Sequence, residues 1–538
     1  MKTTLLTAVL FFLIFSLSLS AQERRGMGAN FDMASIAKTP RKVQLSFQSF
    51  RGMPEQASLE QYCPTPGDQG EHGTCVAFAN GYGIATLLYA KTHDIKDQAV
   101  IDKYVFSPSY LYDLIKDSTD FECQYGSDPI MAVLTLMNMG TPFIRTVPYS
   151  CYVNFSTDAV AEALKYTIKD ASVLFAPGEY AKSGTEMVEM TKKAILEGSP
   201  ISGGFHLPES FFKIKTDVWT SDPNEVDKDW KHNGHAMAVV GFDDNKYGGA
   251  FRILNSWGTA WADKGYVWMR YDDYSRYCIL GLQVFGNPFT PDPEEKIIPV
   301  PDPKPDPKPD PKPVPEPKPV PVPQPVPDVK TMSLSGSIEF KLNTGEDMPV
   351  NKISSRNLMV EEDVVAKEDL VAYTMMNSYS SGTKFRFYMT IDNEAYIYAF
   401  ATDLSGKINR ILPFDDLTST HVGSNSIVAF PSDTKIIKMD ENKGTDYLLI
   451  LYSKEPLNMN EMLAEMNKTK GGLSAKIMAA LGDKLIAKDK IKYDPANVGF
   501  KVNVKYGTRN LSVEDDDSGN TEFASGSVVP LMIEIKHN

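Results

Sequence analysis

The sequence has little positive charge and no stretch in which lysine and arginine cluster. It carries 55 Lys and Arg residues against 69 Asp and Glu residues, which gives a formal net charge of −14 at pH 7. Nucleic-acid binding needs clustered basic side chains that neutralise phosphates. The composition therefore argues against a nucleic-acid partner and favours a peptide or protein as the molecule that this chain binds.

Long apolar runs are absent except at the N-terminus. Lys2 precedes an apolar block from Leu5 to Leu19, and small residues follow up to Ala21. This order is typical of a secretory signal peptide, so we assign residues 1–21 to one and expect a secreted or periplasmic protein in which disulfides persist. The alternative, an uncleaved membrane anchor, is less favoured because the block is short for a span of about 20 residues.

Motifs for metal or cofactor binding are also missing. The sequence contains neither a C-x-x-C pair nor an H-E-x-x-H motif, and we expect no metal site and no cofactor. Cysteine is scarce: all five residues precede position 290, as do five of the seven histidines. An odd number of cysteines in an exported chain leaves at least one thiol unpaired. We therefore expect the chemistry of this protein in the first half of the chain.

Proline is concentrated in residues 290–330, where it occupies nearly every second position. Proline fixes φ and removes a backbone donor, so this segment predicts a semi-rigid polyproline spacer. Since 538 residues exceed the length of one ordinary domain, we expect a short arm or pro-segment at 22–59, a first domain at 60–289 and a second at 331–538. The spacer acts either as a stalk that holds the domains apart or as a linker whose sequence matters little.

A single cysteine stands at a change of pattern in DQGEHGTCVAFA, residues 68–79. Cys75 begins a small, apolar run with helical spacing, and a helix N-terminus is expected to lower the pKa of its thiol. Cysteine catalysis also needs a histidine that shuttles the proton and a third group that orients it. His235 in NGHAMAVVGFDD and Asn255 in RILNSWG supply these groups, and Trp257 can shield their hydrogen bond from water. Taken singly, a cysteine among apolar residues is more often part of a core.

The motifs DQGEHGTCVAFA, GHAMAVVGFD and NSWGTAWADKGY, in this order, resemble those of the papain-like cysteine peptidases over about residues 55–285. The resemblance implies an endopeptidase of the α+β class with a helical and a β-rich subdomain. In it, Cys75 is the nucleophile, His235 the general acid and base, and Asn255 the orienting residue. Gln69 then forms the oxyanion hole together with the backbone N–H of Cys75. The alternative is an inactive protein that keeps this fold and serves for surface or ligand binding.

The same resemblance assigns residues that contact bound peptide. It places Gly126 and Ser127 near the substrate, and we take Gly234 and Trp257 as further substrate-binding residues. The arm at 22–59 is shorter than the usual prodomain of the family and lacks its helical inhibitory pattern. Latency through the usual blocking helix is therefore not expected.

Disulfides are also implied by the resemblance. It pairs Cys123 with Cys151 and leaves Cys63 and Cys278 as a candidate second pair. His72 replaces the cysteine that the family usually carries three residues before the nucleophile, so that family disulfide cannot form in its usual way.

Alternating apolar residues and turn signals dominate the sequence after the spacer. They predict β-hairpins, one with a turn at Asp392-Asn393, a strand at 447–453 and a helical pair within 459–485, hence a mostly β, sandwich-like domain. Residues 375–460 resemble a bacterial domain of unknown function that occurs as an appendage to enzymes, which favours a bacterial source. We expect it to bind a cell-surface or protein partner or to be merely structural, and we expect the whole protein to be a monomer.

Overall fold

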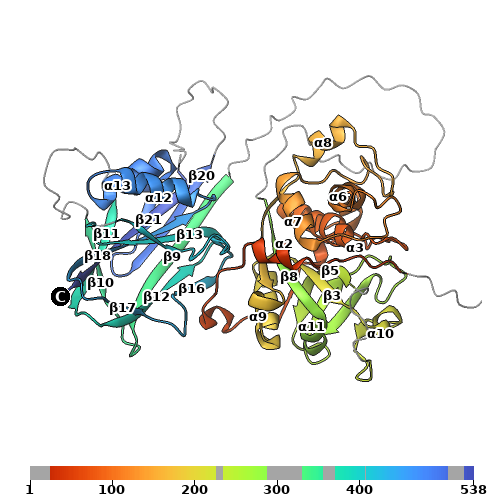
Figure 1. Cartoon of the computed structure of the whole chain (residues 1–538), viewed down its shortest axis with the longest axis horizontal. Helices are drawn as coiled ribbons and strands as arrows, with labels where there is room; N and C mark the ends of the chain where they lie inside the picture. The colour runs from red at the N-terminus through yellow and green to blue at the C-terminus, as the bar shows by residue number, and fades with distance from the viewer. Residues whose placement is uncertain (1–24, 226–233, 288–329, 355–369, 406, 507–525) are drawn as a thin grey trace, which may run out of the picture.

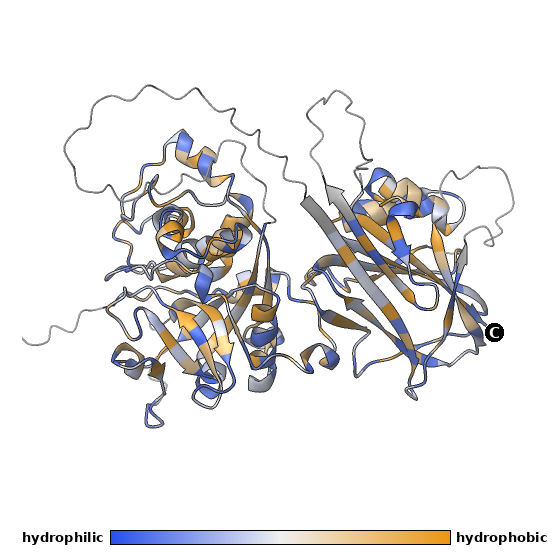
Figure 2. Cartoon of the chain, turned by 180° about the vertical axis from the view of Figure 1, so that it is seen from behind, coloured by the Kyte–Doolittle hydropathy of each residue, from blue (hydrophilic) through white to orange (hydrophobic). Residues whose placement is uncertain are grey.

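The computed structural model describes residues 25–225, 234–287, 330–354, 370–405, 407–506 and 526–538. The expected signal peptide and nearly all of the proline-rich spacer lie outside these residues. Two bodies lie side by side (Figure 1), and hydrophobic residues follow the strands of both (Figure 2). Among the helices in the described ranges, none has the length and apolarity that crossing a bilayer requires.

Helices form one half of the first body. They are α3 (Cys75–Ala77), the π-helical turn η3 (Phe78–Ala85), α4 (Thr86–Thr92), α5 (Gln98–Ile101), α6 (Pro108–Ile115), α7 (Pro129–Asn138) and α8 (Thr157–Ala163). The first three follow one another without a break, as the small, apolar sequence after Cys75 predicts. Side-chain caps from Ser107 and Asp128, each followed by a proline, start α6 and α7.

A twisted sheet forms the other half of the first body. Its strands are β1 (Gln56–Ser58), β2 (Ile168–Phe175), β3 (Ile201–His206), β4 (Val218–Trp219), β5 (Gly234–Asp243), β6 (Ala250–Leu254), β7 (Tyr266–Arg270) and β8 (Cys278–Gly286). The order is β2-β8-β3-β5-β6-β7-β4, and β1 pairs with β5. The helical run 75–92 and α9 (Gly184–Leu196) both contact β5, which explains why nearly all of β5 is buried. The expected α+β fold with two subdomains is confirmed.

The second body is a sandwich of two sheets with a helical pair on its outside (Figure 1). Its strands are β9 (Lys330–Leu342), β10 (Val350–Ser354), β11 (Val371–Tyr379), β12 (Lys384–Ile391), β13 (Ala395–Thr402), β14 (Asn409–Leu412), β15 (His421–Val422), β16 (Ser426–Phe430), β17 (Ile437–Lys438), β18 (Gly444–Ser453), β19 (Ile491–Tyr493), β20 (Val498–Tyr506) and β21 (Val528–His537). One sheet has the order β10-β11-β21-β18-β13-β14 and the other β16-β12-β9-β20-β19. Helices α12 (Met459–Lys468) and α13 (Leu473–Leu481) pack on the first sheet. The sandwich, the strand at 447–453 and the helical pair were all predicted.

The hairpin predicted around Asp392-Asn393 is wrong. Strand β12 pairs with β9, β16 and β17, whereas β13 pairs with β14, β15 and β18 in the other sheet. The turn crosses between the two sheets instead of closing a hairpin. Its side chains bond to strand β9, since Asp392 Oδ2 and Asn393 Oδ1 accept hydrogen bonds from Ser335 Oγ.

Two of the five cysteines form a disulfide. Cys123 and Cys151 are bridged, as the resemblance implied. The candidate pair Cys63 and Cys278 is wrong, because both are free, buried thiols with separate partners. The thiol of Cys63 lies near the Leu59 carbonyl oxygen, and that of Cys278 bonds to the carbonyl oxygen of its own strand at Leu280.

An N-terminal arm, residues 25–58, runs between the two bodies (Figure 1). It contains α2 (Met33–Lys38) and the short helix η1 (Phe47–Phe50), and it ends in β1. Hydrogen bonds and ion pairs also join the bodies directly, for example Lys169 to Glu394 at 2.6 Å. The two domains are thus in contact, which contradicts the interpretation of the spacer as a stalk that separates them.

Candidate active site

Cys75 is the first residue of α3, at the start of the helical run. It is fully buried, and the backbone N–H groups of Ala236 and Gly28 lie against its sulfur. Ala236 follows His235 in β5, whereas Gly28 belongs to the arm. The structure therefore brings the predicted nucleophile to the strand that carries the predicted base, where the two subdomains meet.

His235 is held in one orientation by a side-chain amide. Its Nε2 lies 2.8 Å from Asn255 Oδ1, which also accepts the backbone N–H of Ser256 at 2.8 Å. The indole ring of Trp257 stacks on the imidazole with 4.8 Å between ring centroids. Among the described residues, His235 Nδ1 has no hydrogen-bond partner. Since Nε2 donates to Asn255, Nδ1 is the basic nitrogen that can accept the proton of Cys75.

The side-chain amide of Gln69 is positioned as a hydrogen-bond donor. Ser256 Oγ donates to Gln69 Oε1 at 2.5 Å, which fixes the direction of the amide. Nε2 then donates to the carbonyl oxygen of Gly26 at 3.1 Å and to that of His72 at 2.7 Å. The amide of Gln69 is thus bound to the arm through the Gly26 carbonyl oxygen.

Burial keeps both reacting groups neutral. It raises the pKa of the Cys75 thiol to about 12, although the N–H groups of Ala236 and Gly28 oppose the rise. It also lowers the pKa of His235 to about 4, against the effect of the hydrogen bond with Asn255. The expectation that the helix N-terminus lowers the thiol pKa is wrong for this arrangement, because desolvation of the charged form outweighs the helix dipole.

The arm occupies the cleft through its backbone. The N–H groups of Gly28 and Ala29 donate to the carbonyl oxygen of Gly234 at 3.1 and 2.9 Å, respectively. On the other side, Ser127 N–H donates to Gly28 O at 2.8 Å, and Asn30 N–H donates to Ser127 O at 2.9 Å. We call residues 26–30 the cleft segment. It is bound chiefly through its backbone on both sides.

Glycine is required on both sides of this contact. A Cβ atom on Gly28 would lie 2.1 Å from the carbonyl oxygen of Gly73. Gly126 has a φ of +74°, and a Cβ there would lie 2.3 Å from the carbonyl oxygen of Gly28. Backbone therefore meets backbone closely enough to exclude side chains.

The predicted peptide-contacting residues fall into two groups. Gly126, Ser127 and Gly234 lie against the cleft segment, and their contact with substrate stays a prediction. Trp257 is fully buried and stacked on His235, which suits the predicted shielding of the His235–Asn255 hydrogen bond. In the part of the chain that is described, no group of three or more His, Cys, Asp or Glu side chains could hold a metal ion.

Sequence reasoning missed two residues that support Gln69. Ser256 orients the side-chain amide of Gln69, and Tyr149 OH donates to the backbone carbonyl oxygen of Gln69 at 2.9 Å. Tyr149 also shares a 2.9 Å hydrogen bond with Thr74 Oγ1, next to Cys75. Ser256 directly follows Asn255 within a motif that was recognised, so a signal for it was present. The role of Tyr149 depends on a contact 80 residues away along the chain.

A helical and a β-rich subdomain, with a cysteine on the first and a histidine on the second, define the fold of a papain-like cysteine peptidase. Residues 57–285 match the family model described as "Papain family cysteine protease". Residues 378–456 match one described as "Domain of unknown function (DUF4384)". The resemblance seen in the motifs is thus confirmed: residues 57–285 match a papain-family model, and a match to a domain of unknown function follows at residues 378–456.

Individual proteins show similarity over the same part of the chain. An uncharacterized peptidase C1-like protein of Acanthamoeba polyphaga mimivirus is 29% identical over 213 residues, which is 38% of this chain and 63% of the mimivirus protein. Xylellain, a cysteine protease from Xylella fastidiosa, is 20% identical with a TM-score of 0.40, covering 50% of this chain and 99% of its own. ProCathepsin B S9 from Trypanosoma congolense is 20% identical with a TM-score of 0.38, covering 50% of this chain and 88% of its own.

Proposed function

We propose that this protein is an exported cysteine endopeptidase that hydrolyses peptide bonds through the thiolate of Cys75. The path of the cleft segment is the observation that carries the proposal. A peptide segment lies against the sulfur of Cys75, with the Gly26 carbonyl oxygen bonded to Gln69 and with backbone hydrogen bonds to Ser127 and Gly234. These contacts address the backbone rather than side chains, so they suit peptide substrates of many sequences.

The geometry supports acyl transfer in two steps. His235 Nδ1 takes the thiol proton, and the Cys75 sulfur attacks the carbonyl carbon. The oxyanion that forms accepts hydrogen bonds from Gln69 Nε2 and from the backbone N–H of Cys75. The imidazolium then protonates the leaving amine as the C–N bond breaks, which leaves a thioester. Water, deprotonated by His235, attacks this acyl-enzyme, and cleavage of the C–S bond releases the acid and restores Cys75.

In this proposal, the closed arrangement is an inactive, latent form of the enzyme. The cleft segment fills the place of a substrate, and Cys75 and His235 are both fully buried with neutral side chains. Displacement of the segment hydrates both groups, which brings their pKa values closer together and lets the proton move. Opening of the arm is therefore the step that precedes catalysis.

A glycine substitution in the arm provides an open form for the test. The methyl group of Gly28→Ala would collide with the Gly73 backbone, so the segment has to leave its place. Gly52→Ala is the matched control, because no atom lies within 4 Å of its Cβ; its φ of +66° costs about 1 kcal/mol locally. Each full-length chain is assayed with a mixed fluorogenic peptide library under mildly reducing conditions, with and without Cys75→Ala.

We expect Gly28→Ala to hydrolyse peptides at least about tenfold faster than the unaltered chain or Gly52→Ala, since about 1.4 kcal/mol of lost closure is tenfold in population. Adding Cys75→Ala should remove this activity by roughly 10⁴-fold or more. If the folded Gly28→Ala chain is alkylated readily at Cys75 and still cleaves nothing, the site is open but inactive. That result would support the alternative, a peptide-binding protein that keeps the fold.

A further inference from the structure

The N-terminal arm continues from the cleft to the C-terminal domain. After the cleft segment it forms α2, which contacts α7 and buries Ile36. The arm then crosses to the second body and returns to the peptidase sheet as β1. Figure 1 shows this path between the two bodies. We call residues 41–50 the anchor segment, because they lie on the C-terminal domain.

The backbone at the start of the anchor segment joins the two domains. Arg41 N–H donates to Leu417 O at 2.7 Å, and Ser419 N–H donates to Arg41 O at 2.8 Å. The next residue faces the other way, since Lys42 N–H donates to Val173 O in β2 at 2.9 Å. Strand β2 lies at one edge of the peptidase sheet. The arm therefore extends this sheet and links it to the C-terminal domain.

The anchor segment also adds to an edge strand of the second body. Leu45 pairs with Val428 of β16 in antiparallel register, and Ser46 N–H donates to Ile427 O at 2.7 Å. Ser49 Oγ accepts the N–H of Ile427 at 2.8 Å and donates to its carbonyl oxygen at 3.0 Å. An edge strand offers unpaired backbone groups to an extended segment. Strand β16 thus binds the anchor segment by strand addition.

Side chains strengthen this attachment. Val43 and Leu45 are only 3% and 8% exposed and belong to the core cluster of the C-terminal domain. Burial of these apolar side chains stabilises the docked segment. Asp433 accepts hydrogen bonds from Ser46 Oγ at 2.9 Å and from Phe47 N–H at 2.7 Å. The anchor segment is therefore bound by apolar burial as well as by its backbone.

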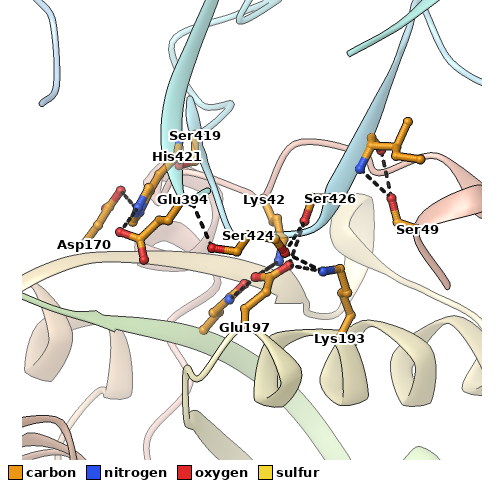
Figure 3. A network of polar contacts seen from close by, with 12 residues as sticks. Lys42, Ser49, Asp170, Lys193, Glu197, Glu394, Ser419, His421, Ser424 and Ser426 are labelled. Atoms are coloured by element: carbon orange, nitrogen blue, oxygen red, sulfur yellow. Dashed lines mark hydrogen bonds and ion pairs between the residues drawn. The ribbon is translucent and has the colours of Figure 1, made fainter. Parts of the chain in front are cut away.

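A buried charge cluster joins the arm and both domains (Figure 3). Lys42 Nζ lies 2.8 Å from Glu197 Oε2, and Lys193 Nζ lies 3.2 Å from Glu197 Oε1. From the C-terminal domain, Ser426 Oγ donates to Glu197 and the Ser424 carbonyl accepts from Lys193. Burial raises the pKa of Glu197, but the two ammonium groups outweigh burial and leave it below its ordinary value. Removal of Lys42 from this site leaves Glu197 with one cation instead of two.

A second polar cluster fixes the C-terminal domain against the peptidase domain. His421 Nε2 lies 3.0 Å from Glu394 within its own domain, and His421 Nδ1 lies 3.2 Å from Asp170 of the peptidase domain. The imidazole also packs on Phe285, with 4.1 Å between ring centroids. Lys169 forms an ion pair with Glu394 at 2.6 Å. The surface that receives the anchor segment is therefore held in place relative to the cleft.

We propose that the C-terminal domain is an intramolecular receptor for the anchor segment and thereby keeps the cleft segment over Cys75. This inference rests on the proposed function of the cleft as the catalytic site. The two segments are joined only by the short stretch that contains α2, so docking of one keeps the other at high effective concentration near its own site. Release of the anchor segment lets the arm leave the cleft more often. The domain of unknown function thus controls access to the nucleophile.

The test measures alkylation of Cys75 in the intact, folded chain. Each variant is treated with iodoacetamide at pH 8, and the labelled thiols are located by mass spectrometry. Two substitutions weaken the anchor: Leu45→Asp places a charge in the core cluster, and Asp433→Ala removes the acceptor of two hydrogen bonds. Alkylation requires no turnover, so the test remains valid if the peptidase assay fails.

Matched controls are present in the same chain. Met33→Asp introduces the same charge at an exposed position of the arm. Asp440→Ala removes an exposed carboxylate of the C-terminal domain whose hydrogen-bond partner among the described residues is Asn442. Cys63 and Cys278 are free and buried, so their labelling reports unfolding of the peptidase domain as a whole.

We expect Leu45→Asp to be alkylated at Cys75 about tenfold faster or more, and Asp433→Ala severalfold faster, because each loses roughly one buried interaction or more. Cys63 and Cys278 should stay protected, and both controls should match the unaltered chain. Two results overturn the proposal, and both include an unchanged alkylation rate at Cys75 in Asp433→Ala. In the first, Leu45→Asp leaves that rate unchanged as well. In the second, Cys75, Cys63 and Cys278 are all labelled alike in Leu45→Asp. Faster labelling without any peptidase activity would support the receptor and refute the proposed function.

Discussion

The two ends of the N-terminal arm are held by different forces. The cleft segment is bound mainly by backbone hydrogen bonds to Ser127 and Gly234, and its side chains add only the small buried Ala29 and the Asn30 amide, which donates to Tyr125 O at 2.8 Å. The anchor segment buries Val43 and Leu45 in a hydrophobic core and places Lys42 in a charge cluster.

The segment that lies over the cleft is therefore not the segment that contributes most of the binding free energy of the arm. Backbone contacts in the cleft restrict the sequence chiefly where two backbones meet, as at Gly28, and each hydrogen bond contributes only about 1 kcal/mol of net free energy. Apolar burial and a buried ion pair are sequence-specific and costly to break. The cleft segment therefore determines what is blocked, and the anchor segment determines how firmly. The predictions below test this division, from the largest expected effect to the smallest.

The protonation of Cys75 should depend on whether the cleft segment is in place. Burial raises its pKa to about 12 from an ordinary value of 9.0, so alkylation of the closed chain should keep rising with pH well above 9. In Gly28→Ala the thiol is hydrated, and the midpoint should move to lower pH. The closed state holds the thiol proton more tightly than the open one, so raising the pH above about 9 also favours opening. Identical rate profiles for the two chains would show that the segment does not bury the thiol.

Lys42→Ala should destabilise the anchored state by about 3 kcal/mol, the cost of breaking a buried ion pair by removing one partner. Lys42 belongs to the anchor segment and not to the cleft segment that covers Cys75. The substitution should nevertheless raise the alkylation rate at Cys75 and lower the midpoint of urea unfolding. Lys38→Ala, at an exposed position of the same arm, is the control. Equal effects of the two substitutions would mean that the cluster does not hold the arm.

Arg25→Ala should have the smallest effect. Arg25 forms an ion pair with Asp68 at 3.0 Å beside the cleft, but the Asp68 side chain is 50% exposed. Exposed ion pairs contribute at most about 1 kcal/mol, so alkylation at Cys75 should rise less than about fivefold, and high salt should remove the difference. An effect larger than that of Asp433→Ala would mean that the cleft end, and not the anchor segment, holds the arm more firmly.

The candidate catalytic residues could be predicted from the sequence because each of them lies in a local sequence pattern. Cys75 begins a recognisable helix, and His235 and Asn255 lie in strand-like motifs that one sheet brings together. The peptidase fold and the sandwich follow from patterns of the same kind. The residues that meet at the candidate site could therefore be named before their geometry was known, and their catalytic roles stay predictions.

The arm and the domain interface could not be predicted in this way. Residues 26–30 bind mostly through backbone atoms, and their few side-chain contacts, from Ala29 and Asn30, form no hydrophobic pattern in the sequence. The charge cluster joins Lys42, Glu197 and Ser426, which are more than a hundred residues apart from one another. The pairing of Cys63 with Cys278 was a candidate only because these two cysteines remained once Cys123 and Cys151 were paired, and such a remainder contains no distances.

Hydrogen exchange at the cleft segment of the unaltered, full-length chain tests the central claim most directly. The amides of Gly28, Ala29 and Asn30 donate to backbone carbonyls of the peptidase domain, so they should exchange far more slowly than in an unstructured peptide of the same sequence. Protection of these three amides is the result that an arm closed over Cys75 requires. Exchange at the unstructured rate, with the amides of β5 protected, would contradict it.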